Sequence, residues 1–355
     1  MNAPPRSHRR SVVRRALVGI VLIGVMAMGG AWLLHASIDP AESVNVSGKG
    51  RERLAAVTSW ALQLGSSSTE RLAEAPHDLL VIDPWADASG AGNPASAAAL
   101  KVKPDGTRRV VMAQLTLSSI DESRPDWSSA WAVPAAAPMA TAAVPGQAAH
   151  AARQPVTSDR PLLGPSAGAP TWLGGERADH RGTFEVRYWQ SAWRHRLFGS
   201  VVAEVDRVIA AGYDGMYLTG VATSASWRHE RPTADTDMTA LVGDIAGYAR
   251  RLKPDFIVVV EDGERVLDGG PVTQAIDGIA KHSVFFTADG SPHQKSVVDG
   301  SVAALRKAAE AGLTVLTIEH LSSGAAIDRA RELNRVENFI PFVQARQIAS
   351  IGRRG

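Results

Sequence analysis

Carboxylic acids recur directly behind short, largely apolar runs of this sequence. Asp83, Glu261 and Glu319 each occupy such a place, which is where a residue at the end of a buried strand would stand. A pair of carboxyl groups can cleave a glycosidic bond, because one protonates the leaving oxygen while the other activates water or attacks the sugar. We therefore take these three acids as the candidate catalytic residues.

Polar and aromatic side chains near these acids are the candidate substrate-binding residues. Tryptophan rings offer flat apolar faces to a sugar, and charged side chains can hydrogen-bond its polar substituents. The candidates are Trp85, Asp121, Arg124, Trp189, Asp262 and His320.

Several of these residues also have a purely structural interpretation. Asp83 could cap the loop that follows its strand, and Asp121 could form an internal ion pair with Arg124. Glu319 and His320 could contact sugar, make structural hydrogen bonds or bind a metal. No His-x-x-x-His spacing supports a metal site, and the sequence predicts no metal or other cofactor.

The elements that would position these residues alternate between apolar strands and amphipathic helices. Helices are expected over Ser200–Ala211, from Asp237 to Leu252, from Asp299 to Gly312 and over Ala325–Asn334. The expected strands are Val57–Leu64, Leu79–Asp83, Val110–Leu117, Tyr213–Leu218, Phe256–Val260, Ile276–Ala280, Leu313–Ile318 and Phe339–Val343.

Eight apolar strands that alternate with helices predict a (β/α)8 barrel of the TIM type, which belongs to the α/β class. No Gly-x-Gly-x-x-Gly follows the first strand, which disfavours a dinucleotide-binding sheet. In such a barrel the active site lies at the carboxyl ends of the strands. The candidate residues should therefore meet at one end of the barrel.

The N-terminal region predicts a membrane address. Residues 1–15 contain five arginines and no acid, and residues 16–34 form an uncharged apolar run long enough to span a bilayer. The arginines should keep the N-terminus in the cytoplasm. We therefore expect a single-pass inner-membrane protein with a periplasmic barrel, or a secreted barrel if the segment is a cleaved signal. Residues 35–50 form a linker to the barrel domain, 51–350.

Composition limits the remaining possibilities. The chain of 355 residues has no cysteine, which excludes disulfides, thiolate metal sites and cysteine nucleophiles. Without the five N-terminal arginines, 33 basic residues stand against 36 acidic residues. This balance predicts no nucleic-acid partner. Residues 128–170 are rich in Ala, Pro, Gly and Ser, and we expect a disordered insertion there.

Three motifs resemble glycoside hydrolase family 114, which includes the endo-α-1,4-polygalactosaminidases. They are PTWLGGE at Pro170–Glu176, VRYW at Val186–Trp189 and GYDGMYL at Gly212–Leu218. Weaker matches extend the resemblance over about residues 57–347. The resemblance implies the same barrel fold, an oligosaccharide or polysaccharide as partner, and a role for Asp83, which the pattern retains.

Several acids of the family pattern are replaced. The replacements are Thr219 and Ala222 for two acids, Glu261-Asp262-Gly263 for Gln-Asn-Gly, His282 for a glutamate, Glu319-His320 for Asp-Tyr, and Asp121 for a glutamate. A threonine cannot act as a carboxylate. Glu261 and Glu319 would therefore have to take over the acid chemistry, or the barrel would bind sugar without cleaving it.

Two functions follow from these observations. The first is a glycoside-hydrolase-like protein that acts on an envelope or extracellular amino-sugar polysaccharide. The second is a non-catalytic carbohydrate-binding barrel in polysaccharide synthesis or export. Nothing in the sequence favours a third function, a purely structural protein held at the membrane.

Overall fold

The computed structural model describes residues 49–65, 67–86, 94–124, 126–135, 160–264, 270 and 272–345. The predicted segments 1–15 and 16–34, and nearly all of the linker 35–50, lie outside these residues. The middle of the predicted insertion, 136–159, also lies outside them. Within the described residues, no helix is long and apolar enough to cross a membrane.

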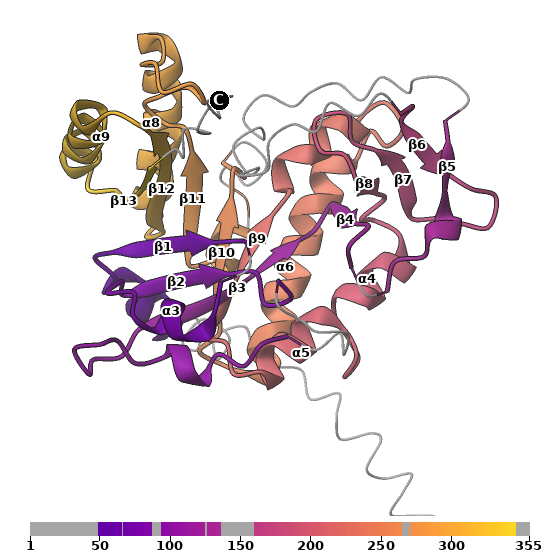
Figure 1. Ribbon diagram of the computed structural model, residues 1–355, viewed down its shortest axis with the longest axis horizontal. Coiled ribbons are helices and arrows are strands. Elements are labelled where there is room, and N and C mark those ends of the chain that lie inside the picture. The colour runs from indigo at the N-terminus through magenta and orange to yellow at the C-terminus, as the bar shows by residue number, and fades with distance from the viewer. Residues whose placement is uncertain are drawn as a thin grey trace, which may run out of the picture. The chain divides into compact units, whose positions relative to one another are not determined.

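Eight parallel strands form one sheet that curls into a nearly closed barrel (Figure 1). In their order around the barrel they are β1 (Trp60–Gln63), β2 (Leu79–Ile82), β3 (Val110–Thr116), β9 (Gly215–Thr219), β10 (Ile257–Glu261), β11 (Gly278–His282), β12 (Thr314–Leu321) and β13 (Ile340–Ala345). Trp60 Nε1 donates a 2.9 Å hydrogen bond to the Ile340 carbonyl across the remaining side. The TIM-type barrel and its eight predicted strands are thus confirmed.

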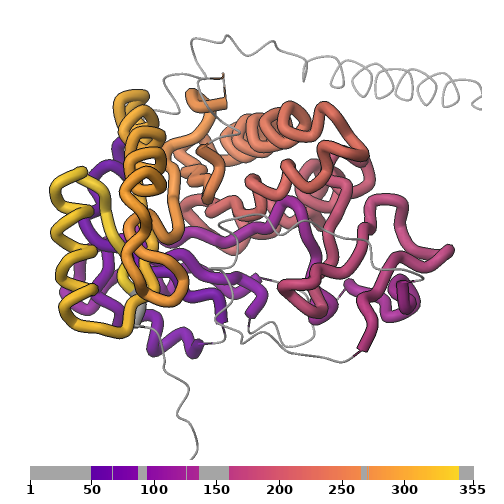
Figure 2. The backbone as a smooth tube through the Cα atoms, turned by 90° about the horizontal axis from the view of Figure 1, so that it is seen from above, coloured from indigo at the N-terminus to yellow at the C-terminus, as the bar shows by residue number. Residues whose placement is uncertain are grey.

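Helices connect the strands. Residues 49–55 are helical, and the other helices are α3 (Thr69–Ala73), η1 (Ala98–Leu100), η2 (Ser129–Trp131), α4 (Ser191–Leu197), α5 (Glu204–Ala210), η4 (Val221–Trp227), α6 (Ala234–Leu252), α7 (Val272–Ala275), α8 (Lys295–Glu310) and α9 (Gly324–Glu337). Arg306 of α8 pairs with Glu337 of α9, and the two helices lie side by side next to β12 (Figure 2).

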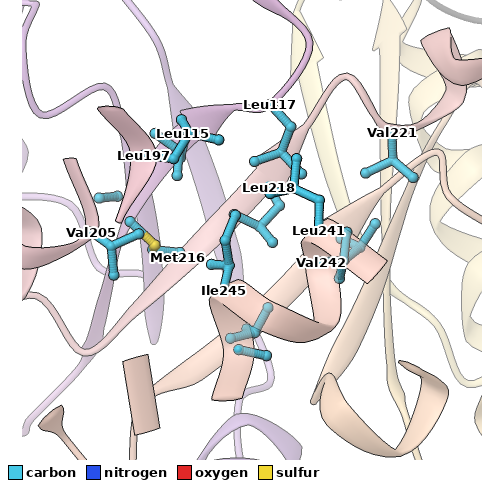
Figure 3. Packing of buried hydrophobic residues seen from close by; sticks show 14 of the residues in the cluster. Leu115, Leu117, Leu197, Val205, Met216, Leu218, Val221, Leu241, Val242 and Ile245 are labelled. Atoms are coloured by element: carbon cyan, nitrogen blue, oxygen red, sulfur yellow. The ribbon is translucent and has the colours of Figure 1, made fainter. Parts of the chain in front are cut away.

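Side chains along each barrel strand alternate between the lumen and the surrounding helices. Met216 and Leu218 of β9 point outward and pack against Leu241 and Ile245 of α6 (Figure 3). The intervening residue, Tyr217, points into the lumen. There it joins a second apolar cluster, whose members include Leu54, Val57, Trp60, Met112, Val259 and Leu316. Leu54 and Val57 precede β1, so they close the lumen at the amino ends of the strands.

A small antiparallel unit is inserted between β3 and β9. It comprises the sheet β4 (Ser119–Asp121), β8 (Thr183–Val186) and β7 (Leu173–Glu176), and the ribbon of β5 (Ala132–Pro134) with β6 (Leu163–Pro165). The sequence does not predict these five strands. The two described ends of the predicted disordered insertion are ordered, because β5 and β6 pair with each other.

One buried carboxylate organises this unit. Glu176 is 2% exposed and accepts two hydrogen bonds from Arg160, one from Arg181, and one each from the backbone N–H groups of Leu163 and Gly182. Burial raises the pKa of Glu176, but the hydrogen bonds outweigh burial and hold it below its usual value. The ionised side chain therefore fastens β6 to β7 and to the turn before β8.

Replacing Glu176 by Gln should destabilise the protein by about 2 kcal/mol at pH 7, because it leaves two arginines without their acid. The loss should shrink at low pH, since the contribution of a carboxylate with a lowered pKa disappears as pH falls through that pKa. Urea unfolding at pH 7 and at decreasing pH values down to pH 3 measures both effects.

Glu185 of β8 is the matched control. It is also buried, but burial raises the pKa of Glu185 above its usual value. Glu185→Gln should therefore leave stability at pH 7 unchanged or increase it. Equal destabilisation by the two substitutions would contradict the role given to Glu176.

Candidate functional site

The lumen changes from apolar to polar at the carboxyl ends of the strands. Along β10, the inward positions run from Ile257 through Val259 to Glu261. Applied to the other strands, the same alternation gives a ring of polar inward positions: Asp83 after β2, Gln114 and Thr116 on β3, Thr219 on β9, Glu261 on β10, His282 on β11 and His320 on β12.

Glu261 lies at the centre of a buried hydrogen-bond network. Its Oε2 accepts a 2.6 Å bond from the Tyr217 hydroxyl and lies 3.0 Å from His282 Nε2. Glu261 is 1% exposed and His282 is 2% exposed. Burial, reinforced by the charge of Glu261, raises the pKa of Tyr217 well above its usual value. The phenol therefore stays protonated and keeps donating to the carboxylate.

A neutral cluster forms the wall made by β3 and β9. Gln114 Nε2 donates to the hydroxyl oxygens of Thr116 and Thr219, at 2.9 and 3.1 Å. The two threonine oxygens lie 3.1 Å apart and also hydrogen-bond. Thr219 therefore adds hydrogen-bonding capacity to this wall but no charge.

The rim of the lumen is more open than its interior. Asp83, Gln114, Thr116 and His320 are partly exposed, whereas Glu261 is buried. The His320 ring stacks on His282 at a centroid distance of 5.8 Å and an interplanar angle of 20°. Asp83 Oδ1 accepts a 2.9 Å bond from the Trp85 backbone N–H, so this acid also caps its loop.

Glu319 does not belong to this ring. Glu319 lies on the same outward face of β12 as Val315 and Leu321, which pack against α8 and α9. Its Oε1 accepts a 2.8 Å bond from the Phe285 backbone N–H, in the loop that follows β11. The other oxygen, Oε2, is buried and finds no hydrogen-bond partner among the described residues. The structure thus separates this candidate catalytic acid from Glu261 and gives it a contact of the structural kind.

Trp85 and Arg124, two of the candidate substrate-binding residues, contact each other. The Arg124 guanidinium lies 4.3 Å from the centre of the Trp85 ring, and it pairs with Glu204 of α5 at 2.9 Å. The expected ion pair between Arg124 and Asp121 is wrong. Asp121 instead accepts hydrogen bonds from the Ser123 backbone and the Thr183 hydroxyl, in the turn after β4 and on β8.

Trp189 packs in an aromatic cluster beside η4. Its ring meets Tyr188 and Trp227 edge-on, at centroid distances of 5.2 and 5.3 Å. Asp262 lies just past the end of β10, where its carboxylate pairs with Lys281 at 3.2 Å. Lys281 shares the outward parity of Ile279 on β11. Of the nine candidate site residues, Asp83, Glu261 and His320 are therefore the ones that the ring contains.

Two side chains that contact Glu261, Tyr217 and His282, are not among the candidate site residues predicted from the sequence. The sequence indicates His282 as a polar residue at a strand end, where a plain loop histidine is the favoured interpretation, and it indicates Tyr217 only as part of a motif. Both could have been found from alternation, since each lies two positions from another inward residue, Thr219 or Ala280. Within the described part of the chain, no group of three or more His, Asp or Glu side chains is arranged to hold a metal ion.

Comparison with known proteins gives relatives and a shared fold. No family model matches the sequence. The chain is 28% identical over 299 residues to an uncharacterized protein of Deinococcus radiodurans, covering 83% of this chain and 82% of that protein. It is 24% identical over 289 residues to an uncharacterized protein of Methanocaldococcus jannaschii, with coverages of 79% and 71%.

Among solved structures, the glycoside hydrolase domain of PelA from Pseudomonas aeruginosa aligns with a TM-score of 0.53. The alignment covers 81% of this chain and 95% of that domain, at 16% sequence identity. A variant of the same domain gives 0.52 at 17% identity. At this low sequence identity, the structural likeness shows the shared fold alone.

Burial raises the pKa of Glu319 to about 7, although backbone N–H groups of the loop after β11, at Val284, Phe285 and Phe286, oppose the shift. Because the folded pKa lies above the usual value, the protonated form stabilises the fold, and this contribution is lost as pH rises through 7. Glu319→Gln should remove it and flatten the stability profile between pH 5 and pH 8, by on the order of 3 kcal/mol. Urea unfolding across this range measures the slope, and parallel profiles for the two proteins would contradict the assignment.

Proposed function

We propose that this chain is a glycoside-hydrolase-like barrel that acts on an amino-sugar polysaccharide of the envelope or extracellular space. The observation that carries the proposal is Glu261, a buried carboxylate held by Tyr217 and His282 at the carboxyl ends of the strands. Enzymes of this fold place their active sites at that end. The glycoside hydrolase domain of PelA shares the fold, which supports a sugar polymer as substrate class.

Two inward carboxyl groups can divide the chemistry. Asp83 is partly exposed and can exchange a proton with solvent, so it is suited to protonate the leaving oxygen and then activate water. Glu261 accepts two hydrogen bonds on one oxygen and is held in a fixed orientation. It is suited to attack the sugar or to stabilise its positive charge in the transition state. Glu319 lies on the outer side of the barrel and has no part in this scheme.

Glycan binding without turnover is the second candidate function. Thr219 favours it, because the family that the sequence resembles has an acid at this position, whereas the Thr219 hydroxyl here bonds Gln114 and Thr116. A polar lumen with a neutral wall can still bind hydroxyl and amino groups. Such a barrel would serve polysaccharide synthesis or export.

Reducing-end release from partially deacetylated galactosamine and glucosamine polymers distinguishes the two functions. Hydrolysis by the wild-type protein should fall by about 10²–10⁴-fold in Asp83→Asn and in Glu261→Gln, as expected for loss of a proton-transfer or charge-stabilising group. Asp244→Asn, on the outer helix α6, is the control and should retain full activity.

The outcome of this assay distinguishes hydrolysis from binding without turnover. Binding of the polymers without release of reducing ends would support the non-catalytic function. Release that survives both substitutions would show that hydrolysis occurs elsewhere on the chain. If the protein neither binds nor cleaves any of these polymers, both proposed functions are contradicted.

We further propose that residues 16–34 anchor the barrel to the inner membrane on its periplasmic side. The uncharged run behind five arginines supports this topology. Cell fractionation should recover the full chain with membranes, and deletion of residues 16–34 should abolish export and leave the protein in the cytoplasmic fraction. A shortened protein that lacks residues 16–34 and is found free in the periplasm or medium would instead indicate a cleaved signal.

A further inference from the structure

Asp262 adopts an unusual backbone conformation directly beside the central carboxylate. Its φ is +50°, in the left-handed region, and it follows Glu261 at the end of β10. A left-handed residue other than glycine costs about 1–2 kcal/mol, although Asp and Asn tolerate it better than other side chains. Residues held in this way cluster where the surrounding structure needs a particular geometry.

Hydrogen bonds show what this conformation achieves. The Asp262 backbone N–H donates to the Ala280 carbonyl at 2.9 Å, and its Oδ1 accepts from the His282 backbone N–H at 3.2 Å. Both bonds join the end of β10 to the end of β11. Asp262 is therefore bound to both chain neighbours of Lys281, Ala280 and His282. These bonds fix His282 relative to Glu261.

Lys281 supplies the charge that this arrangement requires. Its Nζ lies 3.2 Å from Asp262 Oδ1 and 2.7 Å from Glu264 Oε1, and all three side chains are at most 15% exposed. Burial opposes the charge of Lys281, but the two neighbouring acids nevertheless raise its pKa above the usual value. Without this cation, the adjacent carboxylates of Glu261 and Asp262 would repel each other in a buried setting.

We propose that Asp262 is a positioning residue, which holds His282 against Glu261 through its left-handed backbone and its carboxylate, with its charge balanced by Lys281. This role replaces the substrate contact expected from the sequence. The inference rests on the proposed function for its kinetic consequences, but its geometric content is independent of any activity.

The first test is spectroscopic and uses the full chain. A histidine N–H that donates to a carboxylate gives a slowly exchanging, low-field proton resonance, and His282→Gln assigns it. Asp262→Asn keeps a side-chain acceptor and tolerates the left-handed backbone, so the resonance should remain. Asp262→Gly keeps the backbone conformation without strain but removes the acceptor. In that variant the resonance should shift or disappear.

The second test is a double-mutant cycle between Asp262 and Lys281. Lys281→Met leaves the charges of Asp262 and Glu264 without their cation, so the His282 resonance should shift and thermal stability should fall. Adding Asp262→Asn removes the unbalanced charge next to His282 and leaves that of Glu264, so it should restore the resonance and part of the stability. The effects would then be strongly non-additive, as expected for directly coupled residues.

Asp277 provides a matched control at the opposite end of the barrel. Its Oδ2 accepts a 2.8 Å bond from the Val258 backbone N–H and pairs with Arg250 at 2.7 Å. This carboxylate therefore joins neighbouring strands with a basic partner, as Asp262 does, but far along the strands from Glu261. Asp277→Asn should leave the His282 resonance unchanged, whatever its effect on stability.

Kinetics then connect the geometry to function. If the protein hydrolyses glycans, Asp262→Gly should lower kcat by about 10²-fold with little change in KM, because a misplaced group acts on the chemical step. An unchanged His282 resonance in Asp262→Gly, or additive effects in the cycle, would overturn the positioning role. A displaced resonance in a protein without glycan activity would uphold the positioning role and refute only the proposed hydrolysis.

Discussion

The carboxylate of Glu261, buried in the apolar lumen of the barrel, sets the requirements that the rest of the site meets. Glu261 lies above inward-facing Val259 and Ile257, and it is 1% exposed. An ionised carboxylate in such surroundings costs several kcal/mol unless hydrogen bonds replace water. Tyr217 and His282 supply those bonds, and both are themselves fully buried side chains on neighbouring strands. The register of β9, β10 and β11 brings the three together.

At the amino ends of the strands, buried aspartates join neighbouring strands. Asp214 precedes β9 and accepts from the Val111 backbone N–H, and Asp277 precedes β11 and accepts from the Val258 backbone N–H. Each of these acids has a basic partner, Lys101 or Arg250. These two aspartates join neighbouring strands at the amino end of the barrel, where Leu54 fills the lumen. At the carboxyl ends the polar groups of the lumen hydrogen-bond to one another instead, and Asp83, Gln114, Thr116 and His320 there are partly exposed.

The sequence predicts the barrel well because its strands are continuous apolar runs separated by amphipathic helices. The same property hides the site. In a run such as Ile257–Val260, both faces are apolar, so composition does not reveal which side of Glu261 or Glu319 faces the lumen. A one-residue change of parity moves a side chain to the other face. Glu261 points inward, whereas Glu319 points outward to the loop at Phe285.

Contacts between residues far apart in the chain could not be predicted from the sequence either. Arg124 was expected to pair with Asp121, three residues away, but it reaches Glu204 and the Trp85 ring. The strands β5 and β6 are short and weakly apolar. Glu176 holds β6 in place by accepting hydrogen bonds from Arg160 and from the Leu163 backbone N–H. Composition alone therefore suggested disorder at both ends of that segment.

We propose that sugar binds at the carboxyl ends of the barrel strands, around Glu261. A crystal structure of the Glu261→Gln variant with an amino-sugar oligomer tests it most directly. The account predicts the oligomer within hydrogen-bonding distance of Asp83, Gln114 or His320, with a sugar ring over residue 261. An oligomer bound instead on the antiparallel sheet of β4, β7 and β8, with the lumen filled only by protein side chains and water, would contradict it.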